Sequence, residues 1–307
     1  PWARKHLRRG TLHDLIAEVC EGLKIRSLAI QPEAFTLADQ AALAKRRPSL
    51  RLRPVPSLVA DLRIEKSPAE LRRIRKAIRV AEEAFEAAVA GIFIGQTERE
   101  LAARLEYEMK LRGASDAAFP TICAEGPQAA LPHAEPGDRP IRRGSAVLID
   151  WGARVDGYCS DLTRMVWIGS IPREIRKVYP VVLEAQRRAI GAIRPGARMC
   201  DVDAVARDFI AQAGFGDAFG HGLGHGLGRN VHEAPSLSWR SRERLRPGMV
   251  VTVEPGIYLP GVGGVRIEDD VLVTPQGHRV LSKLGKAIDS FLVHRPASRA
   301  KSRRLGA

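Results

Sequence analysis

The chain has 307 residues, 45% of them hydrophobic, which is enough for a sizeable core in one large or two modest domains. It carries 49 Lys and Arg residues against 35 Asp and Glu residues, a formal net charge of +14. No run of about 18 apolar residues is present, which excludes a membrane-spanning helix. The four cysteines have no C-x-x-C spacing, which argues against a zinc knuckle and a disulfide framework.

The positive charge is concentrated in three segments, Lys45–Arg53, Arg72–Arg79 and Arg295–Arg304. Aromatic side chains do not alternate with these charges, as they do in sites for single-stranded nucleic acid, so we interpret the segments as solvated surfaces and do not favour nucleic-acid binding. The N-terminal sequence PWARKHLRRG has no apolar segment typical of a secretory signal, which favours a cytoplasmic location.

Residues 1–65 are predicted to alternate helix, strand, helix and strand. Apolar spacing and β-branched runs place these elements at Leu12–Val19, at Leu28–Ile30, after Pro32 and at Leu50–Val55. Elements this few offer little core of their own, so the region resembles the back half of a domain.

A second domain is expected to begin at Ser67, which has the features of an N-cap. Pro68 at the first helical position and Glu70 closing a capping box predict a helix there. The same box recurs at Thr97–Glu100, and that helix is expected to end at Gly113.

Two more helices and several strands are predicted downstream. The helices cover Ile175–Ala189, with a kink at Pro180, and Val202–Ile210. Strand-like runs cover Ala146–Trp151, Tyr158–Ile168, Met249–Glu254 and Gly264–Thr274. Residues 66–290 are therefore predicted to form an α+β domain, and residues 291–307 a basic disordered tail.

The segment His221–Pro235 reads HGLGHGLGRNVHEAP. Each of the five glycines from Gly220 to Gly228 would cost about 1 kcal/mol inside a helix, so a loop or irregular strand is expected. The low bulk of alternate residues indicates that something approaches this backbone closely. The segment matches neither G-x-G-x-x-G nor H-E-x-x-H, and taken alone it also fits a glycine-rich turn with incidental histidines.

Two pairs of acidic residues flank predicted turns. Asp150 ends an apolar strand and Asp161 follows after the turn dipeptide Asp156-Gly157, so a hairpin is expected to place the two aspartates opposite each other, within a residue of register. Glu254 and Glu268 are expected to form a second opposed pair, because their midpoint falls at Gly261 in a glycine-rich segment.

Four carboxylates buried together would repel one another and take up protons unless a countercharge is present. Two divalent cations would supply that charge. Oxygen-rich ligation with His225 as one imidazole suits Mn²⁺, with Co²⁺ or Zn²⁺ as substitutes.

These residues resemble the pita-bread metallopeptidases, which include Xaa-Pro aminopeptidases, prolidases and methionine aminopeptidases. The similarity covers about residues 65–290. The family's five metal-ligand positions are matched by the following motifs: IDWGARVDGYCSDLTR (Asp150, Asp161), HGLGHGLGRNVHEAP (His225), TVEPGIY (Glu254) and VRIEDD (Glu268).

The sequence HGLGHGLGRNVHEAP and the junction ADLRIEKSPAEL are similar to the Xaa-Pro branch, in which a smaller domain precedes the catalytic one. The resemblance implies a pita-bread catalytic domain at 66–290, a partial α/β N-terminal domain at 1–65, and relatives that are often homodimers. Arg229 and Pro180 depart from the family pattern, and neither is at a ligand position.

The resemblance also implies a mechanism. A metal-bridging hydroxide attacks the Xaa-Pro bond, and Glu254 shuttles its proton to the leaving nitrogen. His133 and His232 bind the substrate and stabilise the tetrahedral intermediate, while His221 lies at the prolyl pocket. The remaining substrate-site residues, Tyr258 and Arg266, hold a carboxylate ligand in place.

The implied activity is the release of the N-terminal residue from peptides with proline at the second position. A prolidase restricted to dipeptides is the alternative, because the distinction depends on what closes the far side of the pocket. A non-enzymatic relative that binds nucleic acid or a protein partner is less favoured, because all five ligand positions are filled.

Overall fold

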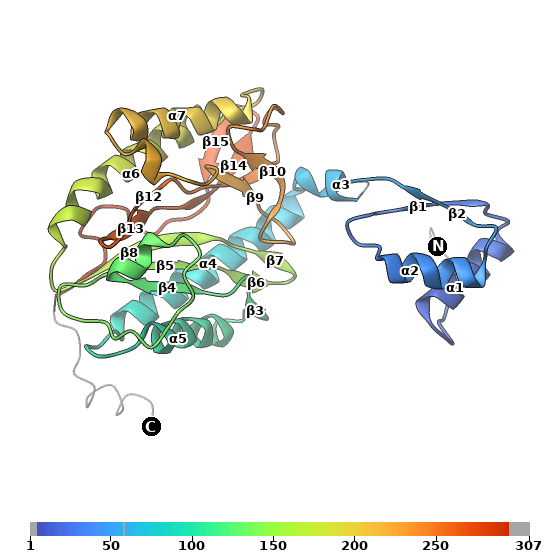
Figure 1. Ribbon diagram of the computed structural model, residues 1–307, viewed down its shortest axis with the longest axis horizontal. Coiled ribbons are helices and arrows are strands. Elements are labelled where there is room, and N and C mark those ends of the chain that lie inside the picture. The colour runs from blue at the N-terminus through green and yellow to red at the C-terminus, as the bar shows by residue number, and fades with distance from the viewer. Residues whose placement is uncertain (1–4, 58, 295–307) are drawn as a thin grey trace. The chain divides into compact units, whose positions relative to one another are not determined.

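The computed structural model describes residues 5–57 and 59–294. The chain divides into two compact units, one ending at Leu62 and the other beginning at Arg63 (Figure 1). Within the described residues, every helix is too short or too polar to cross a lipid bilayer.

The first unit has the predicted order of helix, strand, helix and strand. Its elements are α1 (Leu12–Gly22), β1 (Ser27–Ile30), α2 (Leu37–Arg46) and β2 (Arg51–Pro54). The two strands pair in parallel, and a capping box begins each helix. The short helix α3 (Ala60–Ile64) crosses the boundary between the units.

The second unit contains four long helices: α4 (Pro68–Ala90), α5 (Glu98–Leu111), α6 (Arg173–Ala192) and α7 (Met199–Gln212). Both predicted capping boxes are present, at Ser67 and Thr97. Helix α6 contains Pro180 and continues through it as one helix, and the kink predicted there stays a prediction.

Two larger sheets form the centre of this unit. The first has the order β16 (Leu292–Val293), β8 (Leu162–Ile168), β5 (Ala146–Trp151), β4 (Ile122–Glu125). The second has the order β10 (Glu233–Leu237), β9 (Gly224–Gly226), β11 (Val250–Val253), β14 (Asp269–Thr274), β15 (Gly277–Val280).

Smaller elements extend these sheets. One small sheet has the order β3 (Asp116–Ala117), β6 (Ala153–Val155), β7 (Tyr158–Cys159), and another pairs β12 (Gly256–Leu259) with β13 (Gly263–Arg266). Two 3₁₀ turns are η1 (Gly126–Ala130) and η2 (Gly216–Ala218).

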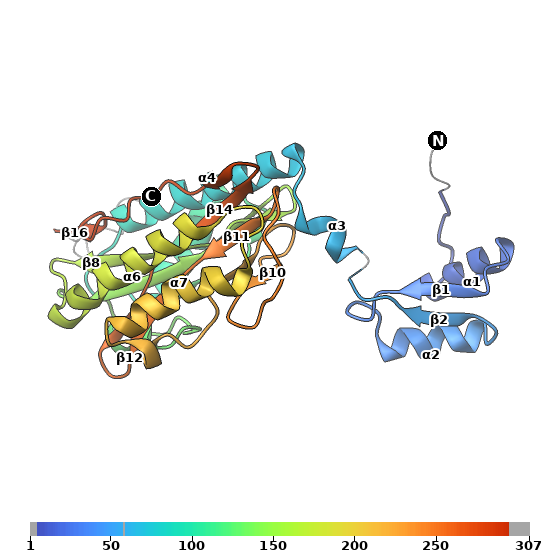
Figure 2. The same cartoon turned by 90° about the horizontal axis from the view of Figure 1, so that it is seen from above.

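Helices cover the sheets from two sides, with α4 and α5 on one side and α6 and α7 on the other (Figures 1 and 2). Alternate residues of β5 follow this division. Val147 and Ile149 pack in the cluster with α4 and α5, whereas Leu148 packs with α6 and α7. Asp150 is two residues from Leu148 and points to the same face of the sheet, so its carboxylate lies on the inner face, between the two layers.

The hairpin around Gly261 has the predicted register. Val253 lies opposite Asp269 in the β11–β14 ladder, and Gly256 lies opposite Arg266 in the β12–β13 ladder. Glu254 and Glu268 lie between these ladders at directly opposed positions, which confirms the predicted pairing.

The hairpin around Asp156-Gly157 corrects the predicted register. Asp156 and Gly157 have φ values of 51° and 75°, as a two-residue type I′ turn requires. This turn places Asp150 opposite Thr163, so Asp161 is offset by two positions and is not directly opposed to Asp150.

The predicted tail at 291–307 begins too early. Phe291 packs edge-to-face on Phe85 with ring centroids 4.9 Å apart, and Leu292 and Val293 pair in parallel with β8. These apolar residues extend the core and its sheet. The rest of the predicted tail, residues 295–307, lies outside the described residues.

Candidate active site

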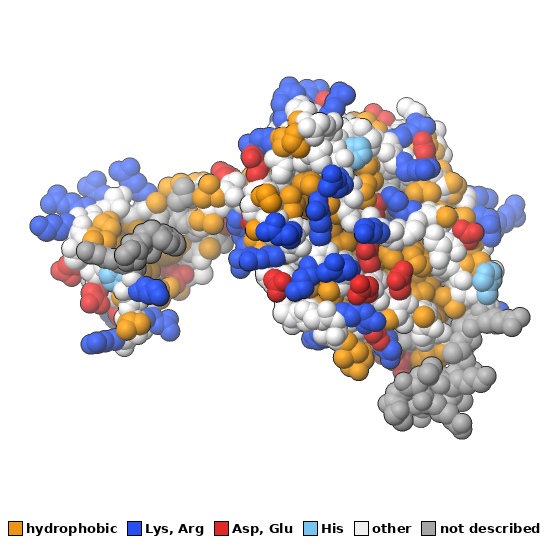
Figure 3. Space-filling model, turned by 180° about the vertical axis from the view of Figure 1, so that it is seen from behind, with side chains coloured by type: hydrophobic (Ala, Val, Ile, Leu, Met, Phe, Trp, Pro, Cys, Tyr) orange, Lys and Arg blue, Asp and Glu red, His pale blue; other side chains and the backbone are white. Residues whose placement is uncertain are grey.

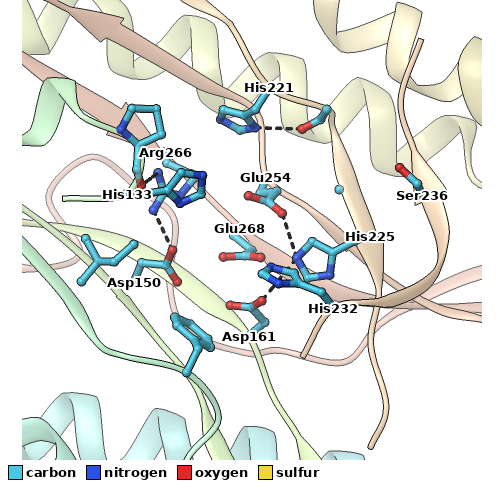
Figure 4. Close-up of a pocket in the computed structure, with 15 residues that line it drawn as sticks. His133, Asp150, Asp161, His221, His225, His232, Ser236, Glu254, Arg266 and Glu268 are labelled. Carbon is cyan, nitrogen blue, oxygen red and sulfur yellow. Dashed lines mark hydrogen bonds and ion pairs between the residues drawn. The ribbon is translucent and has the colours of Figure 1, made fainter. Parts of the chain in front are cut away.

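A cavity of about 290 Å³ opens in the second unit (Figure 4). Every site residue predicted from the sequence except Tyr258 lines it: His133, Asp150, Asp161, His221, His225, His232, Glu254, Arg266 and Glu268. Residues that are about 130 positions apart in the chain thus meet in one small space. Tyr258 contacts this set through hydrogen bonds to Arg266 and His221.

The glycines on either side of His225 are required by close backbone contacts. A Cβ at Gly224 would lie 2.1 Å from the carbonyl oxygen of Thr252, and one at Gly226 would lie 2.2 Å from that of Ala234. Strand β9 can therefore fit between β10 and β11 only with glycine at these positions, which accounts for the low bulk of the segment. His225 is carried on the strand that these contacts hold in place.

The acidic side chains and His225 converge on the same space. The donor atoms of Asp150, Asp161 and Glu268 lie within 4.8 Å of one another, and so do those of His225, Glu254 and Glu268. His225 Nε2 is 3.2 Å from Glu254 Oε1 and 3.5 Å from Asp161 Oδ2. Figure 4 shows these groups pointing toward one another.

Burial dominates the electrostatics of the carboxylates. It raises the pKa of Asp150, Asp161 and Glu268, and nearby carboxylates add to the increase. Burial also acts to raise the pKa of Glu254, but the hydrogen bond and charge of His225 outweigh it and lower that pKa to about 2. The cluster is therefore short of positive charge.

Divalent cations fit this donor set. Asp150 Oδ1 and Glu268 Oε1 are buried and have no hydrogen-bond partner, which is costly unless a cation accepts their lone pairs. Four carboxylates with one imidazole are ligands suited to hard or borderline divalent metals. His225 Nδ1 lies 3.2 Å from the carbonyl oxygen of Gly226, and this contact leaves Nε2 as the free donor atom.

A threonine that sequence reasoning missed links two of the acids. Thr163 Oγ1 donates to Glu268 Oε2 at 2.7 Å and accepts from Arg266 Nε at 3.1 Å. Arg266 Nη2 in turn donates to Asp150 Oδ2 at 2.6 Å. Burial acts to lower the pKa of Arg266, but Tyr258 and Asp150 outweigh it and raise that pKa, so the guanidinium stays charged.

Two further polar residues were also missed. Thr252 Oγ1 accepts the backbone N–H of His225 at 3.0 Å and donates to Glu254 Oε1 at 3.1 Å. Asp270 accepts the backbone N–H of Asp161 at 3.2 Å. Thr163, Thr252 and Asp270 each stand two residues from a predicted ligand, so the period of two along a strand is the signal that could have found them.

Three histidines surround the acidic cluster. Arg266 donates a hydrogen bond to the hydroxyl oxygen of Tyr258. The hydroxyl hydrogen of Tyr258 is then available to donate to His221 Nε2 at 2.8 Å. Burial lowers the pKa of His221 and of His232, which favours neutral rings. The rings of His232 and His225 meet edge-to-face, 4.3 Å apart, and His133 lies beside Arg266 (Figure 4).

Known proteins are similar in sequence to this chain over most of its length. The family model described as metallopeptidase family M24 matches residues 72–275. The Xaa-Pro dipeptidases of Pyrococcus furiosus and Pyrococcus horikoshii are 46% identical over 229 residues and 44% identical over 270 residues. These alignments cover 75% and 88% of this chain, and they span 66% and 76% of the relatives' own lengths.

Solved structures agree with these similarities. The X-Pro aminopeptidase from Thermotoga maritima matches with a TM-score of 0.88 at 39% identity, covering 94% of this chain and 82% of that one. The Xaa-Pro dipeptidase from Bacillus anthracis gives a TM-score of 0.90 at 38% identity, covering 93% and 80%. The family resemblance and the α+β pita-bread fold predicted from the sequence are confirmed.

Proposed function

The chain belongs to metallopeptidase family M24, and from this premise we propose that it is a metal-dependent Xaa-Pro aminopeptidase. It would release the N-terminal residue of peptides that have proline at the second position. The observation that carries this proposal is the convergence of four carboxylates and one imidazole in a cavity that three further histidines line.

The ligand residues would hold two divalent cations, whose four positive charges balance the four carboxylates. We propose Mn²⁺ as the metal, with Co²⁺ or Zn²⁺ as substitutes. When bound, such cations polarise the scissile carbonyl and lower the pKa of a water molecule toward neutrality. The unpartnered oxygens of Asp150 and Glu268 support this assignment. The ligands would be Asp150, Asp161, His225, Glu254 and Glu268.

The chain's own side chains would handle protons and bind the peptide. Glu254 lines the cavity, where its carboxylate would take a proton from the attacking water and deliver it to the prolyl nitrogen. This nitrogen leaves as a secondary amine and must be protonated. His133 and His232 would donate hydrogen bonds to the oxyanion of the tetrahedral intermediate, and His221 would lie against the prolyl ring.

The charges around the cavity favour the aminopeptidase over the dipeptidase. Among the described residues that line the cavity, Arg266 is the only lysine or arginine, and it is 2% exposed. All three of its guanidinium nitrogens already donate, to Thr163, Asp150, Tyr258 and the carbonyl of Pro132. A dipeptide brings a C-terminal carboxylate next to the scissile bond, and this charge would find no free lysine or arginine among the described lining residues.

Three substrates of related size test this preference. Ala-Pro, its amide Ala-Pro-NH₂ and Ala-Pro-Ala should all enter the cavity, and the amide removes the charge without adding a residue. We expect kcat/KM for the amide and the tripeptide to exceed that for Ala-Pro by about tenfold or more, since an unpaired buried charge costs at least ~1.4 kcal/mol. A rate for Ala-Pro equal to or above that of its amide would support the prolidase alternative.

The binding-protein alternative has less support. Figure 3 shows Lys and Arg side chains over one face of the second unit, with Asp and Glu side chains among them. Several exposed basic residues form ion pairs, such as Lys76 with Asp156 and Arg188 with Glu184. Acidic partners of this kind interrupt the positive surface, which disfavours the binding of a polyanion.

The domain division, the location and the assembly state remain proposals. We propose residues 1–65 as an N-terminal domain and 66–290 as the catalytic domain, and the compact units that meet at Leu62 and Arg63 support this. A cytoplasmic location and a homodimer are predictions that fractionation and light scattering can test.

A further inference from the structure

The segment that carries His221 has little secondary structure of its own. Residues 219–223 form no strand or helix, and glycine occupies positions 220, 222 and 224. A backbone with so much glycine has many accessible conformations, so holding His221 at one place in the cavity requires contacts from elsewhere. One backbone bond, from Glu254 N–H to the Leu223 carbonyl at 2.9 Å, ties its end to the sheet.

Two residues of α7 supply the other contacts. Asp203 and Arg207 are one helical turn apart and form a two-pronged ion pair, with Nε–Oδ2 and Nη2–Oδ1 distances of 2.8 and 2.9 Å. Helix α7 runs beside β10 (Figure 2). The backbone hydrogen bonds of the helix do not need the side chains of Asp203 and Arg207, so these side chains can bind another segment. Asp203 is fully buried, and an unpaired carboxylate there would be costly.

The pair holds the backbone of the His221 segment at three alternate residues. Arg207 donates to the carbonyl oxygens of Phe219 at 2.9 Å and His221 at 2.7 Å. Asp203 accepts the N–H of Leu223 at 3.0 Å. These bonds satisfy polar groups that no sheet ladder satisfies, on both sides of the imidazole.

Aromatic rings complete the support. The Arg207 guanidinium lies 4.3 Å from the ring centre of Phe219 and 4.6 Å from that of Trp239. The Phe219 ring meets His221 edge-on, with ring centres 5.0 Å apart. Arg207 therefore fixes both the backbone of His221 and the ring that packs against its imidazole.

We propose that Asp203 and Arg207 are positioning residues that fix His221 at the cavity wall and so set the preference for proline at the second position of the substrate. This inference rests on the proposed function, which places His221 against the prolyl ring. Without the α7 pair, His221 would keep its side-chain contact with Tyr258, but its backbone would be free to move. A displacement of about 1 Å is enough to cost 100-fold in rate for the substrate that depends on the contact.

The test compares Ala-Pro-Ala with Ala-Ala-Ala as substrates of the metal-loaded full chain. Arg207→Met and Arg207→Lys both remove the fork that spans two carbonyls and the carboxylate, and Lys retains the charge. We expect the ratio of kcat/KM for the proline peptide to that for the alanine peptide to fall at least tenfold in both variants, with metal stoichiometry unchanged.

Arg188→Met is a matched control. Arg188 also pairs with an acid one turn away, Glu184, and also lies over a ring, that of Phe209, at 4.0 Å. None of its described contacts involves residues 219–223, so this variant should keep the wild-type ratio. A loss of selectivity in the control equal to that in Arg207→Met would overturn the proposal.

A second variant and a second measurement keep the test decisive if the Arg207 variants do not fold or do not cleave the peptides. Asp203→Asn keeps an oxygen for the Leu223 N–H but removes the charge that orients Arg207, and it should lower the same ratio. Hydrogen exchange at the Leu223 amide needs no activity, and we expect it to quicken at least tenfold in Arg207→Met.

If the wild-type protein cleaves neither peptide, the proposed function fails and amide exchange alone decides the positioning role. Unchanged exchange, or an unchanged selectivity ratio in folded, active variants, would overturn the inference.

Discussion

Gly226→Ala should remove His225 from the metal site while leaving the protein folded. The added Cβ would lie 2.2 Å from the carbonyl oxygen of Ala234 and 2.4 Å from its carbon, and both are backbone atoms that cannot rotate away. To restore ordinary contact, β9 must move by about 1 Å away from β10, and His225 moves with it. Metal–ligand distances tolerate only about 0.2 Å, so we expect at least a 100-fold loss of affinity for one cation.

The cost to folding should be smaller than the cost to metal binding. Overpacking of this kind costs about 1–3 kcal/mol, and each kcal/mol lowers Tm by about 2–4 °C in a domain of this size. The variant should therefore remain folded at 25 °C. Calorimetric titration of the metal-free protein with Mn²⁺ measures the affinity, and circular dichroism measures Tm.

Gly220→Ala is the control for this prediction. It lies in the same glycine-rich segment, but an added Cβ there would have no described atom within 4 Å apart from its own residue and its two chain neighbours. Metal affinity and activity should match the wild type. Wild-type affinity for two cations in Gly226→Ala would show that the packing of β9 does not hold His225 in place.

Three other changes to the site should alter metal binding, turnover and pH dependence in different ways. Thr163→Val should weaken metal binding about 10–100-fold, because Glu268 Oε2 and Arg266 Nε both lose a partner, whereas Thr163→Ser should bind normally in the same titration. His232→Ala should retain both cations by elemental analysis and lose at least about 100-fold in kcat; loss of metal would contradict the role given to it. Without metal, burial raises the pKa of three ligand carboxyls, so the native state binds more protons than the unfolded chain above pH ~4. The free energy of unfolding of the metal-free protein should therefore fall as pH rises from about 4 through these raised pKa values, by up to ~1.4 kcal/mol per pKa unit per group, and added metal should abolish that fall in thermal scans.

The sequence was most informative where one residue type serves one physical purpose. Capping boxes at Ser67 and Thr97 predicted the starts of two helices, because few other patterns satisfy the free N–H groups of a first turn. The midpoint of Glu254 and Glu268 predicted their opposition, because a single turn at Gly261 fixes the register of a continuous hairpin.

The sequence was less informative where the outcome depends on tertiary contacts. The register at Asp150 and Asp161 was mispredicted for a local reason, because the two-residue turn at Asp156-Gly157, which the sequence did indicate, pairs Val155 with Tyr158 and therefore Asp150 with Thr163. The role of Asp203 was invisible, since an acid and an arginine four residues apart on a helix usually form only a surface pair. Its burial and its bond to Leu223 appear only once α7 is packed beside the glycine-rich segment.

Metal-dependent cleavage of a proline peptide is the decisive measurement for the proposed function. Metal-free protein would be incubated with Ala-Pro-Ala and with Ala-Ala-Ala, with and without Mn²⁺, while bound metal is counted by elemental analysis. We expect two cations per chain and release of alanine from the proline peptide only when metal is present. Metal binding without release of alanine, or equal cleavage of the two peptides, would contradict the assignment as an Xaa-Pro aminopeptidase.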